Sequence, residues 1–335
     1  IRATNPCGEQ PLHDNEACNL GSINVARFYD PTKPDAIDWD RLGTTIDLGV
    51  RFLDNVIDTN IYPLPAIEAM ARGNRRIGLG IMGFADLLLL LNLPYADELA
   101  RKTGHKLGAF FRERALAASR ALAGERGSFP NIEQSVYRGT PMRNATVLTI
   151  APTGTISRIA GCSSSIEPVF AFKVISRILD REIRDIHPIF ESWEKDHPEE
   201  TPPAWFVTAS EIEPLDHILM QEVFQTYVDS AVSKTINFPN SATREDIASA
   251  YLLAFDKQIK GITVYRDGRP VLLDFRFNGW GGKYPCALDD RITARLHALG
   301  AFGATPRDPV NLILEGGGIE TDGQGTLLTT VECLL

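Results

Sequence analysis

Apolar residues recur three and four positions apart over six stretches of the sequence, which predicts amphipathic helices. These helices are expected at about residues 40–58, 80–92, 96–124, 215–232, 243–259 and 288–299. Between them, short runs of apolar and β-branched residues predict buried strands at residues 145–150, 169–175 and 261–265. Strands that alternate with helices are typical of α/β proteins, so we expect an α/β fold that is rich in helix.

Local signals place one helix start and one loop. Thr243, followed by Glu245 and Asp246, is typical of a helix start, because such side chains satisfy free backbone donors and suit the helix dipole. The proline-rich residues 197–205 predict an exposed loop, since proline is excluded from helix interiors and central strands.

Length and composition set the scale of the fold. The chain has 335 residues, of which 44% are hydrophobic and 23% charged, enough for one large globular domain or two smaller ones. A turn-like Asp267-Gly268 precedes a segment rich in glycine and aromatic residues. This change of character predicts two domains, residues 1–269 and 270–335. The chain begins at Ile1, and we expect a further portion upstream of it.

Charge and cysteine content exclude several classes of function. A net charge of -9 disfavours sequence-independent binding of nucleic acid, so any bound phosphate is expected on a small molecule. The longest apolar runs fall short of the roughly 20 residues of a membrane helix, and no signal peptide opens the chain, so we expect a cytoplasmic protein. The cysteines are too sparse for a disulfide scaffold and lack zinc-ligand spacing, so no metal is expected: Cys7, Cys18, Cys162, Cys286 and Cys333.

The first candidate site is the segment Asn5-Pro6-Cys7-Gly8-Glu9. In an extended segment, residues two positions apart point to the same side, so the amide of Asn5, the thiol of Cys7 and the carboxylate of Glu9 would face one ligand. The alternative is an ordinary turn, because Asn-Pro and glycine are common turn formers.

The second candidate site is the turn Ala151-Pro152-Thr153-Gly154-Thr155-Ile156-Ser157, which follows an apolar, strand-like run. Backbone N–H groups and hydroxyls in such a turn suit an anion, and a following helix would add its N-terminal dipole. A turn with a threonine or serine cap is the alternative that the residues alone leave open.

Taken together, these motifs resemble class II, adenosylcobalamin-dependent, ribonucleotide reductases. Asn5-Pro6-Cys7-Gly8-Glu9-Gln10-Pro11-Leu12 and Ala17-Cys18-Asn19-Leu20-Gly21-Ser22-Ile23-Asn24 resemble their active-site finger loop, and Pro152–Ser157 resembles their phosphate-binding element. The resemblance covers residues 1–269. It implies the C-terminal part of a ten-stranded α/β barrel with helices outside and a finger loop that carries the radical cysteine.

The resemblance also implies roles for single residues. Cys7 would become a thiyl radical that takes the 3′ hydrogen, Glu9 would act as general base on the 3′-OH, and Asn5 would hydrogen-bond the substrate hydroxyls. Cys18 would be one of two cysteines that end as a disulfide, its partner lying upstream. The phosphate-binding residues would be Thr153, Gly154, Thr155 and Ser157, with the segment 161–168 lining the same pocket and Cys162 having no redox role.

One departure indicates the class. At Gly261-Ile262-Thr263-Val264-Tyr265-Arg266, class I enzymes carry two adjacent tyrosines that relay a radical, whereas this chain has Val264-Tyr265. The resemblance therefore implies adenosylcobalamin as cofactor, a ribonucleoside di- or triphosphate as substrate and a thioredoxin-like external dithiol as reductant. A homodimer is left open. The family-like stretches 75–80, 83–88 and 233–237 are interpreted as mainly structural.

From about residue 271 the sequence resembles a different family, the agmatine and bacterial peptidylarginine deiminases. The similar segments are 274–284 and 314–326, within which Glu315 would hold a substrate guanidinium. That family's catalytic histidine and nucleophilic cysteine lie beyond this stretch, and Cys333 is not its counterpart. We therefore expect a short α/β deiminase-like fragment without deiminase activity. An assembly error, recombination or a deliberate joining of two gene segments would each produce such a joint.

Three functions remain as hypotheses. The preferred one is a ribonucleotide reductase fragment that is inactive by itself, because half the barrel and the second redox cysteine are expected upstream. The others are a guanidine-group hydrolase built on the tail, and a module that binds nucleotide phosphates without turnover.

Overall fold

The computed structural model describes residues 2–178, 181–267, 272–276, 291–300, 307–313, 320–321 and 327–328. The chain divides into two compact units, Ile1–Asn237 with Ala248–Ile262 and Phe238–Ile247 with Thr263–Leu335. The expected domain boundary after residue 269 stays a prediction.

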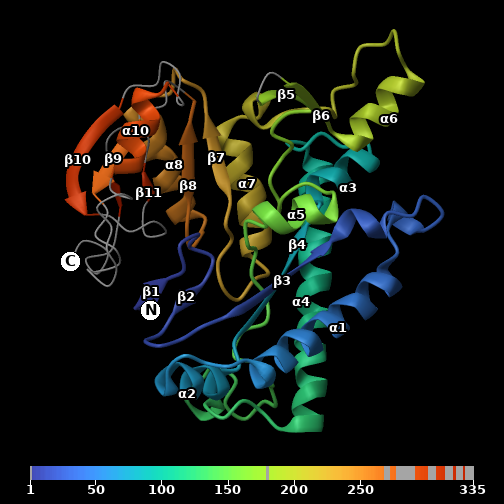
Figure 1. The fold of residues 1–335 in the computed structure, drawn as a ribbon. Coiled ribbons are helices and arrows are strands. Elements are labelled where there is room, and N and C mark those ends of the chain that lie inside the picture. The colour runs from blue at the N-terminus through green and yellow to red at the C-terminus, as the bar shows by residue number, and fades with distance from the viewer. Residues whose placement is uncertain are drawn as a thin grey trace. The chain divides into compact units, whose positions relative to one another are not determined.

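The first half of the chain is organised around a parallel pair of strands, β3 and β4 (Figure 1). Their register runs from Asn19 opposite Ile77 to Asn24 opposite Met82. In chain order the elements are β1 (Ala3–Thr4), β2 (Pro11–Leu12), β3 (Asn19–Asn24), η1 (Val25–Phe28), η2 (Pro34–Ala36), α1 (Trp39–Thr59), α2 (Pro65–Asn74), β4 (Ile77–Met82), α3 (Phe84–Leu90), α4 (Glu98–Arg126) and η3 (Ile132–Gln134).

The second half alternates shorter helices and strands. Strands β5 and β6 pair antiparallel, β9 and β10 pair parallel, and β11 and β12 pair antiparallel. The elements are α5 (Gly154–Ala160), β5 (Lys173–Ile178), β6 (Arg181–Ile186), α6 (Pro188–Asp196), η4 (Ala209–Glu211), α7 (Pro214–Gln225), β7 (Thr235–Phe238), α8 (Arg244–Asp256), β8 (Thr263–Arg266), β9 (Leu272–Arg276), α10 (Ile292–Ala298), β10 (Arg307–Ile313), β11 (Glu320–Thr321) and β12 (Leu327–Leu328). None of the helices described here has the length and apolar character of a membrane span.

A layer that we call the strand wall extends the pair β3–β4 by two extended segments, 147–150 and 231–233. The amide of Leu79 in β4 donates to the carbonyl of Val147 over 2.8 Å, and the amide of Ser233 donates to the carbonyl of Ile150 over the same distance. The isolated bridges that join these segments are parallel. A parallel wall with helices packed on it confirms the expected α/β architecture.

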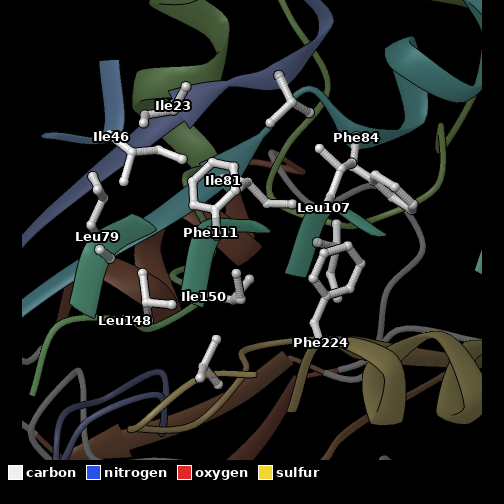
Figure 2. Close-up of a cluster of buried hydrophobic side chains, with 14 of the residues drawn as sticks. Ile23, Ile46, Leu79, Ile81, Phe84, Leu107, Phe111, Leu148, Ile150 and Phe224 are labelled. Carbon is white, nitrogen blue, oxygen red and sulfur yellow. The ribbon is translucent and has the colours of Figure 1, made fainter. Parts of the chain in front are cut away.

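The core lies between the strand wall and helices α1, α4 and α7 (Figure 2). Ile46 of α1, Leu107 of α4 and Phe224 of α7 are buried in one apolar cluster with Leu148 and Ile150. Figure 1 shows α1 crossing the long helix α4. The apolar stripes that predicted these helices therefore face the core, as burial of apolar surface requires.

Several predicted elements differ from the structure. The helix expected at 80–92 begins only at Phe84, because residues 77–82 form strand β4. All six residues of β4 are buried, so its sequence lacks the alternation that marks a half-exposed strand. A side chain at Gly80 would lie 2.2 Å from the carbonyl oxygen of Thr149, so glycine allows the two backbones to approach. The helix expected at 215–232 ends at Gln225.

Other local predictions are confirmed. Helix α8 follows Thr243, whose hydroxyl accepts the amide of Asp246 while its own amide donates to the Asp246 carboxylate. Residues 197–205 contain no helix or strand. The strand expected at 145–150 is extended, but it joins its neighbours only through isolated bridges at Leu148 and Ile150.

Candidate active site

The finger loop, residues 5–10, is a tight turn between the antiparallel strands β1 and β2. The amide of Gly8 donates to the carbonyl of Asn5 over 2.9 Å, and the amide of Gln10 donates to the side-chain oxygen of Asn5 over 2.9 Å. Gly8 has a φ of 75°, a left-handed conformation that glycine adopts without steric cost. Asn5 thus stabilises the finger loop by accepting two hydrogen bonds within it.

This turn corrects one premise of the sequence argument. An extended segment was expected to place Asn5, Cys7 and Glu9 on one side, but residues 6 and 7 form a turn and residue 8 a bend. Cys7 is exposed near the tip, whereas Glu9 is only 2% exposed. The structure therefore brings the three residues into one loop but gives the thiol and the carboxylate different surroundings.

Glu9 is anchored by its backbone. Its carbonyl accepts hydrogen bonds from the amide of Ala231 at 2.8 Å and from the hydroxyl of Thr149 at 3.0 Å. Its carboxylate oxygen Oε2 is buried and has no hydrogen-bond partner among the described residues. Burying such an atom unpaired costs free energy, which is typical of a group whose partner is a ligand.

Cys18 lies immediately before β3. Its thiol donates a weak hydrogen bond to the carbonyl of Asn19 over 3.5 Å. Burial raises the pKa of the thiol to about 12; the charge of Arg76 lowers this pKa, and the charges of Glu16 and Glu9 raise it. Cys18 is therefore a protonated thiol at neutral pH, within the electrostatic reach of the finger loop.

The phosphate turn, residues 151–157, begins helix α5. Thr153 has a φ of 55°, and its hydroxyl accepts the amide of Ser165 over 2.7 Å. The hydroxyl of Ser157 is 2.9 Å from that of Ser164. Both hydroxyls are thus engaged with the neighbouring loop, while Gly154 and Thr155 are exposed at the helix start.

Both motifs are attached to the strand wall. The wall segment 147–150 continues directly into the phosphate turn, and the hydroxyl of Thr149 in this segment binds the carbonyl of Glu9. The second backbone donor to Glu9, Ala231, has a carbonyl that accepts the amide of Ile150 over 3.2 Å. Finger loop and phosphate turn are therefore positioned by the same pair of wall segments.

A buried polar cluster escaped the sequence analysis, in which residues 233–237 were interpreted as mainly structural. The ammonium of Lys234 donates to the carboxylate of Glu167 at 2.6 Å and to Nδ1 of His217 at 2.9 Å. The other carboxylate oxygen of Glu167 accepts the amide of Thr235 at 2.7 Å. The cluster ties the segment after the phosphate turn to α7 and to the start of β7. The sequence feature that indicates this cluster is Lys234, a charged residue within an apolar, strand-like run.

The His217 ring makes stability depend on pH. Burial, followed by the charge of Lys234, lowers the pKa of His217 from 6.5 to about 3. Between these values the unfolded chain binds a proton that the folded chain does not, so the free energy of unfolding falls as pH is lowered. From pH 7 to pH 5 we expect the parent to lose about 2 kcal/mol more than His217→Asn, measured by urea unfolding. Equal acid sensitivity in both proteins would contradict a neutral, buried His217.

Cys162 lies beside a buried acidic side chain. Burial and then the charge of Asp86 raise the pKa of its thiol to about 11. Asp86 in turn is 3.0 Å from Nε2 of His187 and accepts the amide of Ser163. This environment disfavours a thiolate at Cys162. The tail residues Glu315, Cys286 and Cys333 lie outside the described residues.

Comparison with known proteins gives the family. The model of the ribonucleotide reductase barrel domain matches residues 1–141 and 138–265. The chain belongs to the ribonucleotide reductase family, and the class II resemblance is supported by relatives named as vitamin B12-dependent. The model of the Porphyromonas-type peptidyl-arginine deiminase matches residues 246–335, so the resemblance of the tail is also confirmed.

Individual relatives give the extent of the similarity. The chain is 48% identical over 291 residues to the vitamin B12-dependent ribonucleoside-diphosphate reductase of Thermoplasma acidophilum, covering 80% of this chain and 38% of that protein. The enzyme of the same description from Mycobacterium tuberculosis CDC 1551 is 43% identical over 292 residues, covering 80% and 42%. The chain thus spans about two fifths of the length of these relatives.

A solved structure supports the fold. The class Id ribonucleotide reductase alpha subunit of Actinobacillus ureae superposes with a TM-score of 0.65 at 23% sequence identity. The similarity covers 80% of this chain and 54% of that subunit. At this identity the comparison establishes a shared barrel fold.

Proposed function

We propose that residues 1–265 are the part of an adenosylcobalamin-dependent ribonucleotide reductase that carries the radical cysteine and contacts the substrate phosphates. The observation that carries this proposal is the pairing of an exposed Cys7 with a buried Glu9 in one anchored loop. The names of the relatives at 43–48% identity support the cofactor and a diphosphate substrate.

The residues fit the chemistry that this cofactor supplies. Adenosylcobalamin, when bound, would supply radical chemistry, and Cys7 would be the residue that holds the resulting thiyl radical. The thiol of Cys7 lies at the tip of the finger loop and is exposed among the described residues. Cys7 would then take the 3′ hydrogen of the ribose. Glu9, with one carboxylate oxygen unpaired among the described residues, would accept the 3′-OH proton.

The reduction needs two electrons and two protons from a pair of thiols. We assign Cys18 as one of these thiols, since its raised pKa keeps it protonated and therefore able to deliver a hydrogen. The ribonucleotide loses its 2′-OH as water, and the two cysteines become one disulfide. An external dithiol of the thioredoxin type would then reduce this disulfide and become oxidised itself.

Two pairs of residues in the phosphate turn have different proposed roles, contact with the substrate phosphates and support of the turn. We propose that Gly154 and Thr155, which are exposed at the start of α5, contact the substrate phosphates. Thr153 and Ser157 would hold the turn in shape, because their hydroxyls bind Ser165 and Ser164. This is a narrower assignment than the four direct contacts that the sequence resemblance implies.

A chimera tests the proposed function. Residues 1–265 would replace the matched stretch of the Thermoplasma acidophilum relative, which supplies the rest of its own chain. With adenosylcobalamin, a dithiol and a ribonucleoside diphosphate, the chimera is expected to form deoxyribonucleotide. A folded chimera that binds the nucleotide but forms no product would favour the binding module without turnover.

The tail suggests a second candidate function. The match of residues 246–335 to the deiminase model supports a guanidine-group hydrolase, with Glu315 as the residue that would hold the guanidinium. We expect no N-carbamoylputrescine and no ammonia when the whole chain is incubated with agmatine, because the resemblance supplies a binding carboxylate and no nucleophile. N-carbamoylputrescine above the level of a Glu315→Gln variant would overturn this expectation.

A further inference from the structure

Cys18 and Arg76 occupy equivalent places on two neighbouring strands. Each directly precedes the first paired residue of its strand, Asn19 in β3 and Ile77 in β4, and these two residues are partners in the parallel register. Residues at equivalent places in adjacent strands lie side by side and point to the same face. The fold thus sets a cationic side chain beside the proposed redox thiol.

Arg76 is held in place by buried partners. It is 9% exposed, and its Nε forms an ion pair at 3.1 Å with a carboxylate oxygen of Glu16, which is 8% exposed, but makes no hydrogen bond among the described residues. Its Nη1 is 3.4 Å from the hydroxyl of Ser230, which is in turn 3.4 Å from the side-chain oxygen of Gln10. The contacts around Arg76 therefore extend from the Cys18 region to the finger loop.

Glu16 is fixed as an anion. The side-chain amide of Asn74 donates to one carboxylate oxygen over 2.6 Å, and the backbone amide of His13 donates to the other over 3.0 Å. Burial alone would raise the pKa of Glu16, but these hydrogen bonds and Arg76 outweigh it and lower the pKa. Glu16 and Arg76 are thus a buried pair of opposite charges.

Three charged groups act on the Cys18 thiol, namely Arg76, Glu16 and Glu9. Arg76 favours the thiolate, and the two carboxylates favour the thiol. Burial has the largest effect and favours the thiol, and Glu16 opposes the effect of Arg76. Without Glu16, an uncompensated guanidinium would stand beside the sulfur.

We propose that Glu16 is a positioning residue that counters the charge of Arg76 beside Cys18, so that the buried Cys18 stays a neutral thiol and carries a proton as well as an electron into disulfide formation. The role in turnover rests on the proposed reductase function, whereas the control of the thiol does not. Neither residue touches the reacting atoms in this account, and both act through Cys18. The interpretation of residues 75–80 as mainly structural is thereby extended to a functional role for Arg76.

The test removes the charge of Glu16 and measures the reactivity of the Cys18 thiol. Glu16→Gln keeps the size of the side chain and an oxygen that accepts hydrogen bonds, but leaves Arg76 without its counter-charge. We expect iodoacetamide to modify Cys18 at least about tenfold faster at pH 8 in this variant, because an unscreened nearby cation lowers a thiol pKa by one unit or more. Peptide mass spectrometry of the full chain reads each cysteine separately, from pH 6 to pH 10.

Controls separate charge from loosening of the structure. Glu68→Gln removes an exposed carboxylate paired with Arg72 and should leave the Cys18 profile unchanged. The double variant Glu16→Gln with Arg76→Met removes both charges and should return Cys18 to within about threefold of the parent rate, a difference of about 0.7 kcal/mol. Cys162 in the same samples serves as an internal reference.

Either of two results would overturn the proposal. One is an unchanged pH profile of Cys18 in folded Glu16→Gln, and the other is a double variant as reactive as the single one. If Glu16→Gln does not fold, Arg76→Lys decides: it keeps the charge and should keep the slow profile, and fast modification would reject the pair's role. The assay needs no substrate, cofactor or turnover, so its failure is distinct from failure of the reductase function.

Discussion

Cys7→Ser is expected to abolish deoxyribonucleotide formation by the chimera, lowering the rate roughly a thousandfold or more, the scale on which enzymes lose activity with an obligatory catalytic group. Serine has nearly the shape of cysteine, so the loop braced by Asn5 and Gly8 should form unchanged. Its O–H bond is much stronger than the S–H bond, however, and it does not yield a radical that can take a hydrogen from ribose. Product is measured as deoxynucleotide per chain.

Cys162→Ser is the matched control, because it makes the same change at a thiol to which we assign no redox role. Its thiol has a raised pKa and lies beside Asp86, in the segment that follows the phosphate turn. We expect the control to keep activity within about twofold of the parent, or about 0.4 kcal/mol in barrier height. Residual turnover by Cys7→Ser at the level of the control would remove Cys7 from the mechanism.

Asp54→Asn is expected to lower the free energy of unfolding by about 3 kcal/mol, near the lower end of what breaking a buried ion pair costs. Asp54 is fully buried in α1, and its carboxylate accepts Nε of Arg75 at 2.8 Å and Nε of Arg143 at 3.2 Å. The amide keeps the shape but leaves these guanidiniums without their shared anion. Arg75 retains Asp58, at 2.8 and 2.9 Å, which limits the loss.

Asp47→Asn on the same helix is the control for this measurement. Asp47 pairs with Arg114 at 2.6 Å, but the two side chains are 40% and 47% exposed to solvent. Exposed pairs contribute between about 0 and 1 kcal/mol, so urea unfolding followed by circular dichroism should barely change. If the two variants were equally stable, the buried cluster around Asp54 would not hold α1 in place.

Sequence patterns predicted those parts of the fold whose signal is local. The stripes of α1 and α4 and the cap at Thr243 depend on residues a few positions apart, and the structure confirms them. Strand β4 was missed because it is apolar on both faces, and nothing in its own residues distinguishes it from a buried helix.

In the candidate site, too, local features were predicted from the sequence and contacts between distant residues were not. The finger loop and the phosphate turn are continuous motifs, so the resemblance of the sequence locates them. The pairs Glu16–Arg76 and Lys234–Glu167 join residues 60 and 67 positions apart. Only the register of the strands and the path of the chain bring such charges together, and no spacing rule along the sequence predicts them.

The attachment of Glu9 through its carbonyl has a consequence for how this enzyme family can change over time. The carboxylate takes its place from Thr149 and Ala231, whereas Cys7, two residues earlier, is joined to that anchor through the left-handed Gly8. Thr149 takes no part in the proposed chemistry, but loss of its hydroxyl would displace Glu9, the proposed base, while sparing the thiol. A requirement for the proposed catalysis would therefore also constrain a residue of the strand wall. Residue 149 is expected to vary as slowly among descendants as the finger loop that it anchors.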